Sequence, residues 1–297
     1  MQNIEKERYS WLKLSIVLLL IGLFGALTAM SEGTEVPMNL DDQAAINNLK
    51  ILQAIATVVL FIAPAITFAV LFTKSGISYL GINAKPKLKT VVIGGLGMVL
   101  ALPLINYFME LNKGLQLPES MHAMEVWMQK SESSLKKVTE AFMQGTDTST
   151  LFLNLFVVAF MAALSEELFF RGVLQKLLID CTKNKHVSVW IGAILFSAFH
   201  MQFYGFLPRM MMGAYLGYLF VWSGSLWPGI TAHFLNNGLA VYLTWLSNRG
   251  TIAADTDTVG TGSEQSIYTI ISLIMVVTSM ILVYRIEKKD HPVLNVE

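Results

Sequence analysis

The feature that most constrains the fold is an apolar segment, about residues 151–178, that carries two adjacent glutamates and an arginine near its middle. The segment is long enough to cross a bilayer, which takes about 20 apolar residues. Each such charge near the centre of a membrane helix costs about 2.5 to 3.5 kcal/mol on insertion scales. A chain that keeps Glu166, Glu167 and Arg171 at this depth is expected to turn them toward a protein interior and to use them.

The composition indicates an integral membrane protein. Hydrophobic residues make up 54% of the 297 residues and charged residues only 14%, against about 25% charged residues in soluble domains. Apolar segments recur along the chain, so the sequence predicts one integral membrane domain, residues 1–297, with an all-α fold. This polytopic bundle is expected to hold about eight transmembrane helices, at 11–29, 51–73, 91–108, 151–178, 187–203, 206–222, 227–247 and 266–284.

The distribution of basic residues predicts the orientation of these spans. Lys and Arg concentrate in the segments that are inside if the N-terminus is cytoplasmic, which agrees with the positive-inside rule and places both termini in the cytoplasm. The first apolar run is long for a signal peptide and no A-x-A site follows it, which favours a retained helix. Residues 109–148 are expected to form an amphipathic extracytoplasmic loop, either an interfacial helix or a lid that guides substrate.

Charge and cysteine content exclude two kinds of chemistry. The formal net charge is zero, so no basic surface indicates a nucleic-acid partner. Cys181 is the single cysteine, so no intrachain disulfide can form. A nucleophilic role for Cys181 is disfavoured because it follows the fourth span among lysines, with no histidine at matching depth.

Polar residues of three different spans are expected at similar depths. At 1.5 Å per helical residue, Glu166 lies about 15 Å, His200 about 20 Å, His233 about 12 Å and Asn237 about 18 Å from the inner surface. Scattered, merely tolerated polar residues are not expected to coincide in this way. The sequence therefore predicts a shared intramembrane site, provided that the three helices are neighbours.

Residue spacing within the spans assigns some of these side chains to pairs. Glu167 and Arg171 are four residues apart and can form an ion pair on one helix face, which leaves Glu166 free to act as a general base. His233 and Asn237 share the same spacing and project from one face. In the sixth span, Gly213 and Gly217 form a G-x-x-x-G pair, which permits close approach of another helix.

Three short motifs on successive apolar segments carry a resemblance to a known family. Glu166-Glu167-x-x-x-Arg171, Phe196-x-x-x-His200 and His233-x-x-x-Asn237 occur in this order. The chain thereby resembles the CAAX protease and bacteriocin-processing (CPBP, or ABI) family of intramembrane glutamic endopeptidases, of the type II CAAX prenyl endopeptidase kind. The resemblance covers about residues 150–247 as a protease core and leaves residues 1–149 as accessory spans.

The resemblance implies a mechanism and a substrate class. Glu166 and His200 would activate a water molecule, and His233 and Asn237 would stabilise the oxyanion on the scissile carbonyl. Glu167 and Arg171 would orient Glu166. The substrate would be a membrane-associated protein or peptide within the lipid bilayer. The reaction would be of the CAAX type, or would serve bacteriocin or signal-peptide processing and self-immunity.

Several alternatives stay open at this point. No metal or other cofactor is expected, but Glu166, His200 and His233 are alternative zinc ligands, although no H-E-x-x-H motif is present. The polar residues could also form a structural ion network, a proton relay of a transporter, or part of a non-catalytic scaffold that regulates a membrane partner such as a sensor kinase. The expected location is a bacterial plasma membrane, with the endoplasmic reticulum membrane as the alternative.

Overall fold

The computed structural model describes residues 10–18, 42–115, 117–252, 259, 261 and 266–288. Regular structure in these ranges is entirely helical, with no strand, which confirms the predicted fold class. A short helix over 10–18 precedes the others. The main helices are α2 (Gln43–Thr57), α3 (Ala63–Phe72), α4 (Leu88–Val99), α5 (Leu102–Lys113), α6 (His122–Met143), α7 (Thr148–Asn154), α8 (Ala162–Phe169), α9 (Lys176–Thr182), α10 (Lys185–Phe199), α11 (Phe206–Ser223), α12 (Trp227–Asn248) and α13 (Ser266–Lys288).

Several of these helices join end to end. A π-helical turn at Val58–Ile62 connects α2 to α3, and two more connect α7, α8 and α9. The results are an outer rod, residues 43–72, and a central rod, residues 148–182. Pro64 of the outer rod has no N–H for an α-helical bond, and the π-helical turn lies directly before it.

The structure supports only some of the eight predicted membrane spans. Among the described residues, Gln43–Phe72, Thr148–Thr182 and Ser266–Lys288 are long and apolar enough to cross a membrane, and a fourth span is reached if α4 and α5 count as one. These two helices meet at an angle of 46°, because Pro103 in the first turn of α5 cannot continue the hydrogen bonding of α4. The sequence predicted one uninterrupted span there. Residues 19–29 of the first predicted span lie outside the described residues, and the count of eight stays a prediction.

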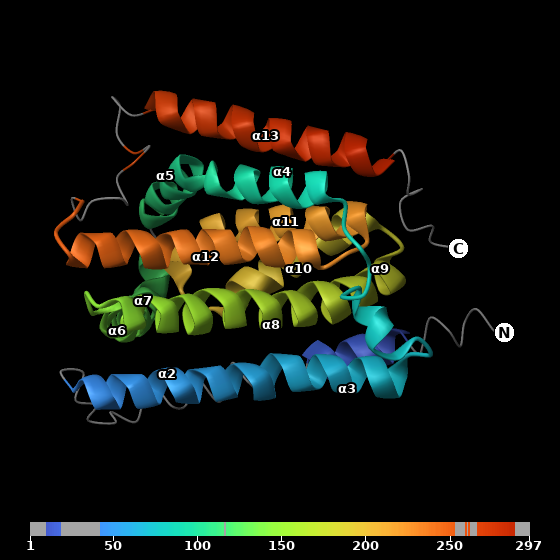
Figure 1. Ribbon diagram of the computed structural model, residues 1–297, viewed down its shortest axis with the longest axis horizontal. Coiled ribbons are helices and arrows are strands. Elements are labelled where there is room, and N and C mark those ends of the chain that lie inside the picture. The colour runs from blue at the N-terminus through green and yellow to red at the C-terminus, as the bar shows by residue number, and fades with distance from the viewer. Residues whose placement is uncertain are drawn as a thin grey trace.

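The helices pack in layers (Figure 1). The central rod lies between the outer rod on one side and α12 on the other, and α4 and α13 follow beyond α12. Helices α10 and α11 pack against each other behind this stack. The second half of the central rod is buried between its neighbours, with Phe169, Phe170 and Leu174 among its most buried side chains, whereas Phe152 and Phe156 of the first half are exposed.

Local sequence fixes where the central rod begins and ends. Asp147 caps its first turn, because the carboxylate accepts hydrogen bonds from the Ser149 hydroxyl and from the hydroxyl and backbone N–H of Thr150. These bonds hold the pKa of Asp147 below its usual value. At the other end, Lys183 adopts a left-handed conformation with φ of 54°. Asn184 then starts α10 by accepting from the backbone N–H groups two and three residues ahead.

An aromatic cluster joins the outer rod to the central rod and to α10. The ring of Phe61 lies 5.7 Å from Phe169 and 5.2 Å from Phe199, both edge to face. The ring of Phe170 contacts Phe196 at 5.2 Å in the same geometry. Such pairs add about 0.5 to 1.5 kcal/mol each beyond the burial of their area, so this cluster fixes α10 against the central rod.

The predicted amphipathic segment is helical. Helix α6 covers residues 122–143 of this segment, and its Ala141 and Phe142 pack on Ile46 of the outer rod. On its exposed face, Lys136 and Glu140 form an ion pair at 3.7 Å. Its position outside the cytoplasm stays a prediction.

Candidate active site

The central rod supplies the buried ion pair that the sequence predicted. Glu167 lies in α8 and Arg171 in the π-helical turn that follows. Arg171 Nη1 donates to Glu167 Oε1 at 2.6 Å, and the two side chains are 2% and 0% exposed. The predicted pairing across four residues is confirmed by this geometry. A buried charge without a partner costs several kcal/mol. In this pair each charge offsets that cost for the other.

Helix α11 completes the hydrogen bonding of the π-helical turn. Arg171 Nη2 donates to the carbonyl of Gly213, and Gln175 Nε2 donates to the carbonyl of Gly217, both at 3.0 Å. A Cβ on Gly213 would lie 3.1 Å from Ala193 of α10. The two glycines therefore allow the close approach that their spacing predicted. The role of Gln175 was not foreseen, although it stands four residues after Arg171.

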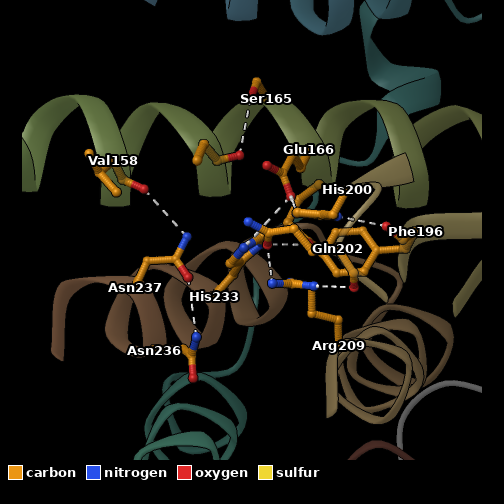
Figure 2. Close-up of polar contacts among 12 residues, drawn as sticks. Val158, Ser165, Glu166, Phe196, His200, Gln202, Arg209, His233, Asn236 and Asn237 are labelled. Atoms are coloured by element: carbon orange, nitrogen blue, oxygen red, sulfur yellow. Dashed lines mark hydrogen bonds and ion pairs between the residues drawn. The ribbon is translucent and has the colours of Figure 1, made fainter. Parts of the chain in front are cut away.

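Glu166 faces two histidines from two other helices. Its Oε2 atom lies 3.9 Å from His200 Nε2, at the end of α10, and 3.8 Å from His233 Nε2, in α12. The oxygen is buried and has no hydrogen-bond partner among the described residues, since these distances exceed the 2.7 to 3.2 Å of a direct bond. The structure thus brings together the glutamate and the two histidines that the sequence predicted to share a site (Figure 2).

The second nitrogen of each histidine identifies its tautomer. His200 Nδ1 is 2.8 Å from the carbonyl oxygen of Phe196, which can only accept, so Nδ1 carries a proton. His233 Nδ1 lies 3.1 Å from Glu167 Oε1 and donates to that carboxylate. In the neutral state, both Nε2 atoms therefore present a lone pair toward Glu166. Glu167 holds His233 as well as Arg171, a contact that the sequence did not predict.

Asn237 lies one turn along α12 from His233, beside the central rod. Its Nδ2 donates to the carbonyl of Val158 at 3.4 Å, and its Oδ1 accepts from Asn236 at 3.1 Å. Figure 2 shows this side chain next to Val158. Asn237 thus lies beside His233 on α12, and its hydrogen bonds go to Val158 and Asn236 rather than to the glutamate or the histidines.

A second arginine belongs to the site and was missed at the sequence level. Arg209 donates to the backbone carbonyl of Gln202 at 3.1 Å and also to its side-chain oxygen. It also interacts electrostatically with Glu166 and with His200. Arg209 is the one charged residue in the apolar segment 206–222. That isolation was the available signal, because a charge inside such a segment needs a partner.

The geometry can be compared with the zinc alternative. Ligands that bind Zn²⁺ tetrahedrally at 2.0 to 2.1 Å stand about 3.3 Å from one another. The separations around Glu166 Oε2 are 3.8 and 3.9 Å, wider than such a sphere. Over the described ranges, no group of three or more His, Cys, Asp or Glu side chains is arranged to hold a metal ion.

A glycine next to the ion pair gives a testable prediction. A Cβ at Gly229 would lie 2.9 Å from Glu167 Oε2, closer than normal contacts allow. We expect Gly229→Ala to destabilise the fold by about 1 to 3 kcal/mol, as overpacking does, although alanine is otherwise the better helix former. Gly238→Ala in the same helix is the control, because its Cβ would meet Leu155 at an ordinary 3.6 Å. Thermal unfolding of both variants in detergent tests this; equal midpoints would contradict it.

Comparison with known proteins points to the region that holds this site. Residues 148–239 match the family model described as type II CAAX prenyl endopeptidase Rce1-like. YpbD, an uncharacterized protein of Bacillus subtilis strain 168, is 28% identical over 86 residues, which are 28% of this chain and 41% of that relative. No solved structure matches. The chain therefore carries a type II CAAX prenyl endopeptidase Rce1-like domain at residues 148–239.

Proposed function

We propose that the protein is an intramembrane endopeptidase that hydrolyses a peptide bond of a membrane-associated protein or peptide. One observation carries this proposal: the buried Oε2 of Glu166 has no hydrogen-bond partner and faces the Nε2 atoms of His200 and His233. A buried acceptor without a partner costs about 1 to 3 kcal/mol, which a water molecule bound between the three groups would offset. A gap above 3.5 Å between polar groups is where a bridging water is expected.

The proposed reaction uses that water as the nucleophile. A water off the line between Glu166 and His200 can donate to the carboxylate and to the free Nε2 lone pair. One proton of the water passes to Glu166 or His200 while the water oxygen adds to the carbonyl carbon of the scissile peptide bond. When the C–N bond breaks, the proton goes to the leaving amine nitrogen. Glu166 and His200 are thus the general base and its partner.

Stabilisation of the oxyanion is assigned to His233 and Asn237. Because Nδ1 of His233 donates to Glu167, His233 can donate from Nε2 only when both nitrogens are protonated. Asn237 has a second amide hydrogen beyond the one used on Val158. Donors of this kind in a dry site contribute about 3 to 4 kcal/mol to the transition state.

The proposed setting is a membrane with eight spans and both termini in the cytoplasm. The α3–α4 connection, α9 and the end of α13 lie at one end of the bundle in Figure 1. Lys87 contacts Glu287 there at 3.1 Å. This end would be cytoplasmic. Cysteine labelling from each side of the membrane, in a Cys181→Ala background, measures the orientation. The similarity to a Bacillus protein supports the bacterial plasma membrane over the endoplasmic reticulum.

The substrate class rests on the matching domain. The family model is described as a CAAX prenyl endopeptidase, which supports a CAAX-type protein as the substrate. Bacteriocin or signal-peptide processing and self-immunity are further candidate roles. The test uses purified protein in proteoliposomes and a panel of membrane-anchored peptides, some ending in a prenylated cysteine motif and some not prenylated. We expect the wild type to cleave members of one group and Glu166→Gln to leave them intact, with no effect of a chelator. Equal cleavage by both proteins would contradict the proposal, and activity that zinc restores after chelation would favour the metal alternative.

A further inference from the structure

The residues between His200 and α11 form a loop, residues 201–205, that a side chain of α5 holds in place. We call this segment the His200 loop. Asn112 is only 7% exposed. Its Nδ2 donates to the carbonyl of Phe203 at 2.7 Å, and its Oδ1 accepts from the N–H of Leu207 at 2.8 Å. One buried amide therefore satisfies a main-chain acceptor and a main-chain donor on either side of the turn into α11.

Helix α6 adds a second attachment. Glu132 Oε2 accepts from the backbone N–H of Tyr204 at 2.9 Å, and the ring of Trp127 lies 5.4 Å from that of Phe203. Both helices lie outside residues 148–239, the part that matches the protease family. The accessory segment thus contacts the backbone directly after a residue of the site.

The His200 loop has an unusual backbone conformation that its contacts must hold. Met201 has a φ of 53°, a left-handed conformation that a residue other than glycine adopts only when its surroundings enforce it. Beside these contacts, a pocket of about 230 Å³ opens between the loop, α5 and α6. Its lining includes Asn112, Glu125, Met128, Phe203, Tyr204 and Phe206. The hydrogen bonds of Asn112 and Glu132, together with those from Arg209 to Gln202, hold the backbone beside this pocket.

The position of His200 follows from that of the loop. His200 directly follows α10 as its C-cap, where the backbone N–H groups of His200 and Met201 already bond to carbonyls three residues back rather than four. Its ring is fixed by one bond, to Phe196, and its side chain is 27% exposed, against 4% for His233. A change in the chain direction at Met201 would move Nε2 away from Glu166.

We propose that Asn112 and Glu132 are positioning residues of the active site, which act through the His200 loop to set His200 against Glu166. The inference deepens the proposed function and rests on it, because it assigns the accessory helices α5 and α6 a part in the same site. Neither residue touches the reacting atoms. Their contribution is the geometry of the Glu166–His200 pair.

The first test separates catalysis from binding. We expect Asn112→Leu and Glu132→Leu to lower kcat by about 10²-fold, the effect of a displacement near 1 Å, with little change in KM. Glu132→Gln should keep nearly full activity, because its amide oxygen can still accept from Tyr204. Asn106→Leu is the matched control on α5, since Asn106 also donates to a loop carbonyl, that of Val259. A loss in Glu132→Gln equal to that in Glu132→Leu would overturn the positioning role of Glu132.

The second test does not need a substrate. Diethyl pyrocarbonate modifies neutral histidines at an accessible nitrogen, and peptide mass spectrometry gives the rate for each histidine. We expect modification of His200 to rise several-fold in Asn112→Leu and Glu132→Leu, but not in Glu132→Gln or Asn106→Leu, while His233 stays protected. Unchanged modification of His200 in both leucine variants would overturn the inference. If Glu166→Gln still cleaves while His200 modification rises as expected, the proposed function fails and the link between loop and histidine stands.

Discussion

Replacing His200 by glutamine is expected to slow cleavage by about 10²- to 10⁴-fold, the usual contribution of a general acid or base. Glu166→Gln should have an effect of the same size, because glutamine keeps the shape of the side chain but takes no proton. The two groups face each other across 3.9 Å and are assigned to the same water. The double variant should therefore be no slower than the slower single variant, as for residues that act as a unit.

The measurement is the single-turnover rate of the purified variants in proteoliposomes with one cleavable peptide. Glu140→Gln is the control, because that carboxylate is 61% exposed on α6 and pairs only with Lys136. It should keep the wild-type rate. If the effects of Glu166→Gln and His200→Gln multiply in the double variant, the two side chains act in separate steps and the shared-water mechanism is wrong.

Arg171→Met is expected to give the largest loss of stability, about 3 to 5 kcal/mol in the free energy of unfolding. Removing one member of a buried ion pair leaves the other charge without compensation, and Glu167 is 0% exposed. The substitution also removes the hydrogen bond from Arg171 to the carbonyl of Gly213. The central rod and α11 should therefore separate more easily in this variant.

The double variant Glu167→Gln with Arg171→Met identifies the cause. It should recover part of the lost stability, because no buried charge is then left unpaired. Lys136→Met breaks an exposed pair and should change stability by less than about 1 kcal/mol. Reversible unfolding in mixed micelles provides the comparison. A single-variant loss no larger than that of Lys136→Met would show that the pair is hydrated rather than buried.

The sequence predicted those features of the fold and of the site that depend on short-range patterns. Apolar runs located the helices from α2 to α13, and the spacing of four residues predicted the pair of Glu167 with Arg171. The three motifs named Glu166, His200 and His233, which lie together in the structure. The helix positions and the ion pair follow from helix geometry, which is regular enough to carry them, whereas the motifs rest on the resemblance to a known family.

Other features depend on how helices meet, which periodicity does not encode. The contact between His233 and Glu167 requires a particular rotation of α12 against the central rod. The partners of Asn112 lie more than 90 residues away in the chain. The bend between α4 and α5 was missed because an apolar run through Pro103 reads as one span until its neighbours are known. Depth estimates grouped Asn237 with the other polar residues but did not show that its amide faces Val158.

The most direct test of the account compares cells that carry wild type or Glu166→Gln at matched membrane levels. Membrane-associated and secreted peptides are catalogued by their newly formed termini. The account predicts that a small set of termini present with the wild type disappears in the variant, and those termini then define the substrate. Identical catalogues, in cells where deletion of the whole protein still causes a phenotype, would contradict it and favour a non-catalytic membrane scaffold.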